Sequence, residues 1–198
     1  MMKSFRGAGT SRQRGQSLVE FGLVLTVMAV MLSAVLEFGL AIDADLALEA
    51  ASREGARVAA TLGNDGTQGI CENAIADNAA TGVDAMVVQA VQTSLSGGGV
   101  ALSTVQIWIY QADANGAAVG GHINNYTWNG SAFASTDGHP YHACGRADGT
   151  FGAGAYDSIG VKVQYTYTSS TGLLAIFTGG LKMSAAAVMP IGPPWKLQ

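Results

Sequence analysis

The carboxylate of Glu20 is the most informative chemical group in the sequence, because it stands at the entrance of a long apolar run. An unpaired carboxylate is costly at such a position. If the chain were cleaved after Gly15, Gln16 would gain a free ammonium, and Glu20 would lie one helical turn away from it. The carboxylate could then pair with that ammonium or with the ammonium of a neighbouring copy, which would fix an axial stagger between chains. The alternative is an interfacial side chain that reaches toward water.

A second group with chemical potential lies far along the chain, where His139, His142 and Cys144 are close in sequence and His122 lies upstream. Imidazole and thiolate groups are zinc ligands, so this group could hold zinc if the side chains converged. However, the spacing matches no recognised zinc motif, and ordinary loop histidines are the alternative. We therefore assign no metal ligand and no cofactor.

The segment that positions Glu20 has the features of a membrane span. Residues 21–42 contain one ionisable residue, Glu37, and a helix of this length spans roughly 33 Å, which crosses a bilayer. Residues 1–15 form a basic leader without acidic residues, and its cations are Lys3, Arg6, Arg12 and Arg14. Because basic flanks stay inside, we expect the carboxyl-terminal side to be exported.

The apolar run continues without proline or turn residues, so residues 16–62 are predicted to form one helix, transmembrane at first and then amphipathic. Glu49 and Arg53 form a favourable i,i+4 pair on its second half. Small residues recur there at spacings of three and four, namely Ala44, Ala47, Ala51 and Gly55. This stripe predicts close approach of another backbone, with simple helix propensity of alanine as the alternative.

The only two cysteines, Cys71 and Cys144, both follow the predicted span and would be exported with the rest of the domain. An even number of cysteines outside the cytosol favours a disulfide, which would stabilise the fold by about 4 kcal/mol in the chain-entropy model. We therefore predict a Cys71–Cys144 bond, and two unpaired thiols are the alternative.

Residues 63–198 are predicted to form one exported domain of the α+β class, with a second helix and a small antiparallel sheet. A turn is expected at Asn115 and Gly116, and the glycine-rich residues 100–157 have no assigned role. Apolar periodicity predicts helices over residues 70–95 and 173–177, and strands over residues 105–110, 159–167 and 181–189.

Composition and motifs argue against two classes of function. The net charge is −4 and only 12% of residues are charged, so there is no basic surface of the kind that binds nucleic acid. The sequence also lacks a nucleophile elbow, a phosphate-binding loop and a zinc-protease helix. We therefore expect a protein that is not an enzyme and has no catalytic residues.

Two weaker features of the middle region have structural alternatives. Asn125 and Asn129 begin glycosylation sequons, but asparagine beside glycine and serine is also typical of turns. Four aromatic residues could form an exposed adhesive patch or belong to the core, namely Trp108, Tyr126, Trp128 and Tyr141.

The run RGQSLVEFGLVL at residues 14–25 resembles the processing site of type IV pilin-like proteins. In that family a prepilin peptidase cuts after the glycine, here Gly15, and a glutamate follows at the fifth mature position, here Glu20. Together with EFGLAIDADLALEAASREGARVAA at residues 37–60, the run is similar to TadE-like pseudopilins of tight-adherence (Flp) pilus systems. The resemblance covers residues 12–62, and residues 158–191 fit the family more loosely. Thr26, where the family often has proline, and the glycine-rich middle depart from it.

This resemblance implies a minor pilin or pseudopilin that is cut between Gly15 and Gln16 and uses Glu20 and Phe21 in pilus assembly. The implied partners are the prepilin peptidase, other pilins, the pilus assembly platform and the membrane. The implied location is the inner membrane with an exported domain, or the outside of the cell within a pilus. The alternatives are a membrane-anchored periplasmic binding module or enzyme, and an adhesin at the pilus tip.

Overall fold

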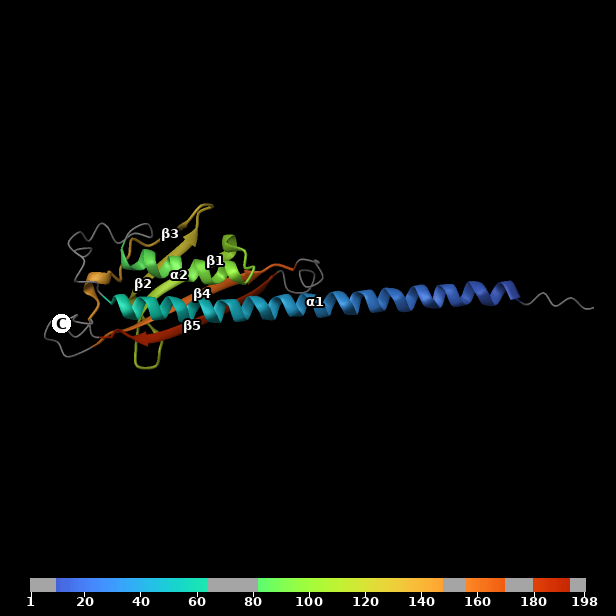
Figure 1. Cartoon of the computed structure of the whole chain (residues 1–198), viewed down its shortest axis with the longest axis horizontal. Coiled ribbons are helices and arrows are strands. Elements are labelled where there is room, and N and C mark those ends of the chain that lie inside the picture. The colour runs from blue at the N-terminus through green and yellow to red at the C-terminus, as the bar shows by residue number, and fades with distance from the viewer. Residues whose placement is uncertain (1–9, 64–81, 148–155, 170–179, 193–198) are drawn as a thin grey trace, which may run out of the picture.

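A computed structural model describes residues 10–63, 82–147, 156–169 and 180–192. Helix α1 (Thr10–Leu62) is an unbroken rod of 53 residues. Its first half projects alone, and its second half lies along a domain built from helix α2 (Val83–Gly97) and a β-sheet (Figure 1). The predicted α+β class, with a long amino-terminal helix, a second helix and a small antiparallel sheet, is confirmed.

Within the described residues, the sheet has five strands in the order β3-β2-β1-β4-β5, and each neighbouring pair is antiparallel. The expected turn at Asn115 and Gly116 joins β1 to β2, and Asp113 closes it by accepting a hydrogen bond from the Asn115 N–H at 2.8 Å. The strands are β1 (Val105–Ala112), β2 (Ala118–Trp128), β3 (Phe133–Ser135), β4 (Ser158–Tyr167) and β5 (Leu181–Pro190). The three predicted strands therefore correspond to β1, β4 and β5.

The structure adds two strands within the glycine-rich middle that the sequence pattern did not predict. Strand β2 reads AVGGHINNYTW, and glycine and asparagine are poor strand formers. It forms because Ala118 and residues 123–127 pair with β1, for example Tyr126 opposite Ile107 and Asn124 opposite Ile109. Of the predicted second helix, the described part is α2, while residues 70–81 and the predicted helix at 173–177 lie outside the described residues.

The core lies between one face of the sheet and the two helices. Residues of β4 alternate as predicted, so Ile159, Val161 and Val163 are fully buried beneath the helices. Leu48 of α1 and Val91 of α2 are buried in the same cluster. The amphipathic second half of α1 is therefore part of the core of the domain.

The predicted stripe of small residues is the surface along which α1 packs. Ala44, Ala51 and Gly55 are buried. A Cβ placed on Gly55 would lie 2.6 Å from the Val91 side chain and 3.0 Å from that of Val161, which is closer than packed carbon atoms approach. The absence of a side chain at Gly55 thus lets α1 contact both α2 and β4.

Replacing Gly55 by leucine is expected to destabilise the protein, because the new side chain would overlap Val91 and Val161. Overpacking typically costs about 1 to 3 kcal/mol, and the better helix propensity of leucine returns less than about 1 kcal/mol. Urea unfolding of the full chain in detergent micelles, followed by circular dichroism, measures the change. Ala50→Leu on the exposed side of α1 is the matched control, and equal stability of the two variants would contradict the packing shown here.

Candidate assembly site

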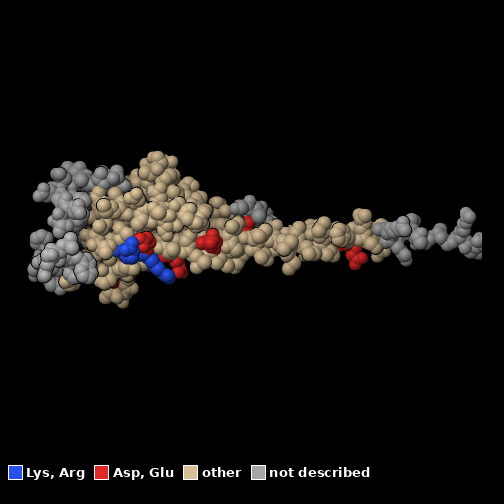
Figure 2. All heavy atoms as spheres, in the orientation of Figure 1, with Lys and Arg blue, Asp and Glu red and all other residues tan. Residues whose placement is uncertain are grey.

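The residues proposed from the sequence for processing and assembly lie on the projecting half of α1. Gly15, Gln16, Glu20 and Phe21 are all exposed and all helical, and the helix places Gln16 and Glu20 one turn apart. Figure 2 shows few charged side chains along this half, whereas charged side chains gather where α1 lies on the domain. The site is therefore a single helix surface on which Glu20 is the one charged group between residues 15 and 36, where the side chains are described.

Apolar side chains cover this half of α1 on every side. Phe21 is 66% exposed and Val27 is 52% exposed, although both are large and hydrophobic. Among the described residues, α1 is the one helix that is long and apolar enough to cross a membrane, and its apolar part is not buried by the domain. A helix that is hydrophobic all round requires an apolar environment, supplied by lipid or by other helices.

Thr26, a departure from the family pattern, is accommodated within the helix. Its hydroxyl donates a hydrogen bond to the Gly22 carbonyl oxygen, one turn earlier, at 2.8 Å. The polar group is therefore satisfied within the helix and does not need water.

Glu37, the ionisable residue within the apolar run, is covered by the domain. It is only 1% exposed, while its neighbours Leu36 and Phe38 are exposed. The Tyr167 hydroxyl at the end of β4 lies 3.2 Å from the Glu37 carboxylate and 3.5 Å from its carbonyl oxygen. Burial, together with this carboxylate, raises the pKa of Tyr167, so the tyrosine is a neutral hydrogen-bond donor.

A buried ion pair inside the domain was missed by the sequence analysis. Arg146 lies 2.6 Å from Asp84, and both side chains are completely buried. Asp84 is in the first turn of α2, where the helix dipole also favours a negative charge. An acidic residue at a helix start was the available sequence signal, but nothing in the sequence paired it with an arginine 62 positions away.

Three further side chains complete the surroundings of this pair. Asn124 and Tyr126 of β2 donate hydrogen bonds to the other Asp84 oxygen at 2.7 and 2.8 Å. Asn124 also accepts a hydrogen bond from the Tyr141 N–H at 2.8 Å, and the Arg146 guanidinium lies 4.7 Å from the centre of the Tyr141 ring. Burial raises the pKa of Tyr141, so its phenol stays neutral. The cluster joins α2 and β2 to the loop after β3 that contains Tyr141 and Arg146. Its role is therefore structural.

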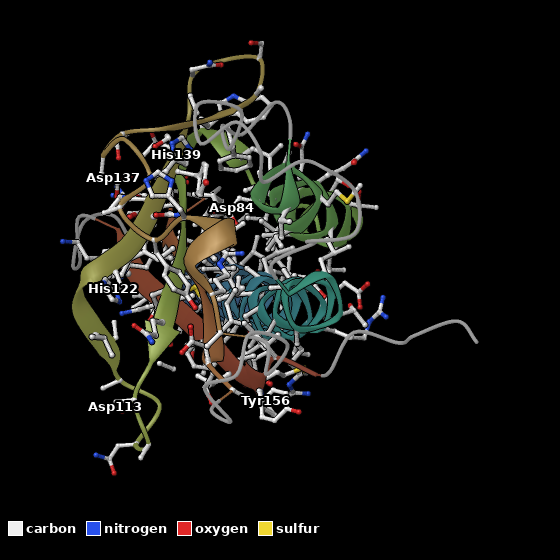
Figure 3. The ribbon with its side chains drawn as sticks, turned by 90° about the vertical axis from the view of Figure 1, so that its left-hand side faces the viewer. Asp84, Asp113, His122, Asp137, His139 and Tyr156 are labelled. Atoms are coloured by element: carbon white, nitrogen blue, oxygen red, sulfur yellow. The ribbon has the colours of Figure 1, made fainter. Side chains whose placement is uncertain are left out.

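The histidines considered for zinc binding do not converge on one point. His122 lies on β2, where it contacts Gln111 and stacks on Tyr141. His139 has a backbone φ of 59° in a turn and packs near Tyr126, and His142 is exposed. Figure 3 shows His122 apart from His139 and Asp84. Among the residues that the structure describes, no three potential metal ligands are grouped together.

Four of the remaining candidates from the middle region pack in the core or form a turn. Tyr126 and Tyr141 are buried, so the four aromatic residues do not form one exposed patch. Trp128 packs edge-on against Phe133. The Asn129 side-chain oxygen accepts hydrogen bonds from the Ser131 and Ala132 N–H groups, both at 3.0 Å, as expected for an asparagine that opens a turn.

The predicted disulfide falls partly outside the described residues. Cys71 belongs to the undescribed segment 64–81, while the backbone of Cys144 is in the short 3₁₀ helix Ala143–Gly145. The Cys71–Cys144 bond therefore stays a prediction.

In the described part of the chain, the protein consists of one long apolar helix that carries an α+β domain. Residues 15–57 match the family model described as TadE-like protein, which confirms the resemblance to TadE-like pilus proteins over this segment. The match begins at Gly15 and ends within the docked half of α1. No curated protein and no solved structure matches the chain.

Replacing Arg146 by methionine is expected to destabilise the domain strongly, because Asp84 would keep its buried charge without the opposite charge beside it. Breaking a buried pair from one side typically costs about 3 to 5 kcal/mol. The matched control is Arg53→Met, which breaks the exposed Glu49–Arg53 pair and should cost less than about 1 kcal/mol. Thermal unfolding of the full chain in micelles compares them, and similar losses in the two variants would show that the buried pair has no special weight.

Proposed function

We propose that this protein is a minor pilin or pseudopilin of a tight-adherence pilus system, and that it works by packing rather than by catalysis. The observation that carries the proposal is the projecting half of α1, which exposes apolar side chains on every side in the segment that matches the TadE-like family. A catalytic protein would need only an anchor at this place. A pilin-like protein needs a helix that leaves the membrane environment for contacts with other helices.

The proposed topology follows from the charges at the two ends of the apolar run. The leader, residues 1–15, is basic and stays in the cytoplasm, whereas Asp43 and Asp45 are the first charges beyond the run. The protein is thus inserted as a precursor in the inner membrane, with the α2 and sheet domain exported. A prepilin peptidase then cuts between Gly15 and Gln16.

Cleavage creates a positive charge close to the Glu20 carboxylate. The new ammonium of Gln16 lies one turn before Glu20, about 6 Å along the helix axis. In the low dielectric near the bilayer, attraction between the two charges is far stronger than in water. Pairing between neighbouring chains would select one axial stagger, while Phe21 and the following apolar residues supply the contact area.

The domain leaves this surface available for partners. It covers α1 from Glu37 onward and buries the small-residue stripe, but residues 15–32 remain exposed along their whole length. Other pilins and the assembly platform are the partners that fit such a helix. The size of the domain favours a minor component, because a helix alone suffices for a major pilin.

The first expected result is a mature chain that begins at Gln16. Amino-terminal sequencing of the protein from cell envelopes checks this, with a strain lacking the peptidase as control. A start at Met1, or at a residue beyond Ile42, would overturn the pilin interpretation.

The second expected result concerns Glu20→Gln, which should be inserted and largely processed but should fail to associate with its pilin partners. Removing the carboxylate leaves the Gln16 ammonium unpaired, and a loss of about 3 to 5 kcal/mol corresponds to a hundredfold or more in association. Quantitative co-purification with pilin partners is the measurement. Glu49→Gln, in the docked half of α1, is the matched control and should associate normally. Normal recovery of the complex from Glu20→Gln would show that Glu20 is only an interfacial side chain.

A further inference from the structure

Glu37 lies inside the apolar run and is also covered by the domain, so the domain cannot stand wholly beyond the end of the run. Glu37 lies five residues before Ile42, so it sits about 7.5 Å inside the end of the run. Yet Glu37 is 1% exposed, because the end of β4 covers it and the Tyr167 hydroxyl lies 3.2 Å from its carboxylate. The domain therefore contacts α1 at a level that the apolar run assigns to the membrane.

The opposite side of α1 confirms that its apolar character continues past this level. Phe38, Ile42 and Leu46 are spaced four residues apart and are all exposed, so they form one apolar ridge on the side away from the domain. This ridge is continuous with the apolar surface that precedes it. In the single-pass orientation of the proposed function, lipid on one side of α1 therefore reaches the height at which the domain lies on the other side.

The part of the domain at this level is the end of the sheet where β4 finishes and β5 begins. Tyr167 pairs with Leu181, and Thr166 pairs with Lys182. Leu181 is 42% exposed and Lys182 is also exposed. Figure 1 shows this end of the sheet beside α1, near the point where the helix leaves the domain. An exposed leucine beside an exposed lysine is typical of the boundary between acyl chains and headgroups, where the lysine stem lies along apolar surface and its ammonium reaches the polar layer. Tyr167 itself is buried against Glu37.

We propose that this end of the sheet, carrying Tyr167, Leu181 and Lys182, is seated in the headgroup region of the bilayer. The inference rests on the single-pass orientation in the proposed function, and the partner is the lipid surface itself. Leu181 reaches the top of the acyl chains, and Lys182 remains among the phosphates. Tyr167 shields the Glu37 carboxylate from lipid, so the domain and α1 enter the interface as one unit.

Tryptophan scanning in nanodiscs with brominated acyl chains tests this seating, because bromine quenches tryptophan fluorescence at short range. The probe is Leu181→Trp in the full chain, and its signal is taken as the difference from the unsubstituted protein. Val188→Trp is the matched control, since Val188 is 38% exposed near the far end of the same strand. Val27→Trp, within the apolar run and away from the domain, reports insertion of α1. Lys182→Trp is a second probe at the seated end.

We expect the difference signal at Val27 to be strongly quenched, that at Leu181 and Lys182 to be quenched at least twofold, and that at Val188 to be unchanged. Quenching at Val27 with none at Leu181 and Lys182 would overturn the seating and leave the membrane anchor intact. Equal quenching at Leu181 and Val188 would also overturn it, because the sheet would then have no preferred end. Absence of quenching at Val27 would overturn the anchor and, with it, both proposals.

Discussion

The structure depends on one unbroken helix that must satisfy two different environments. An α-helix bonds its own backbone internally, so α1 can pass from an apolar medium into a folded domain without leaving polar groups unpaired. Only the distribution of apolar side chains around the helix has to change between the two environments. It changes near Glu37, before which the helix is apolar all round and after which one side belongs to the core of the domain.

Close packing on that one side holds the domain to the helix. Gly55 allows α1 to touch both α2 and β4, and Gly98 at the end of α2 lies against Ala47. Such contacts have little tolerance for added atoms, so the orientation of α1 relative to the sheet is fixed by shape. The Asp84–Arg146 pair acts elsewhere, where it ties α2 to β2 and the following loop. A buried pair is costly to break from one side, although replacing both partners by apolar residues is often neutral.

The two halves of α1 therefore differ, because one half packs in the domain and the other half is exposed. The domain is stiffly attached and buries few of the apolar side chains that lie before Glu37, so those side chains stay available for lipid or for neighbouring helices. In the function we propose, the Glu20 charge at the start of this surface sets the register of the assembly, since charge attraction is strong in a low-dielectric environment.

The sequence by itself determined the features that depend on local periodicity and composition. These are the length of α1, the packing stripe through Ala51, the Asn115 turn, strands β1, β4 and β5, and the TadE-like segment with Glu20. Only the tertiary structure decided the features that depend on partners distant in the chain. Strand β2 forms because β1 supplies its hydrogen bonds, and Asp84 is neutralised by an arginine from a remote loop. The covering of Glu37 by Tyr167 joins residues 130 positions apart, and no pattern of neighbouring residues encodes a contact over that distance.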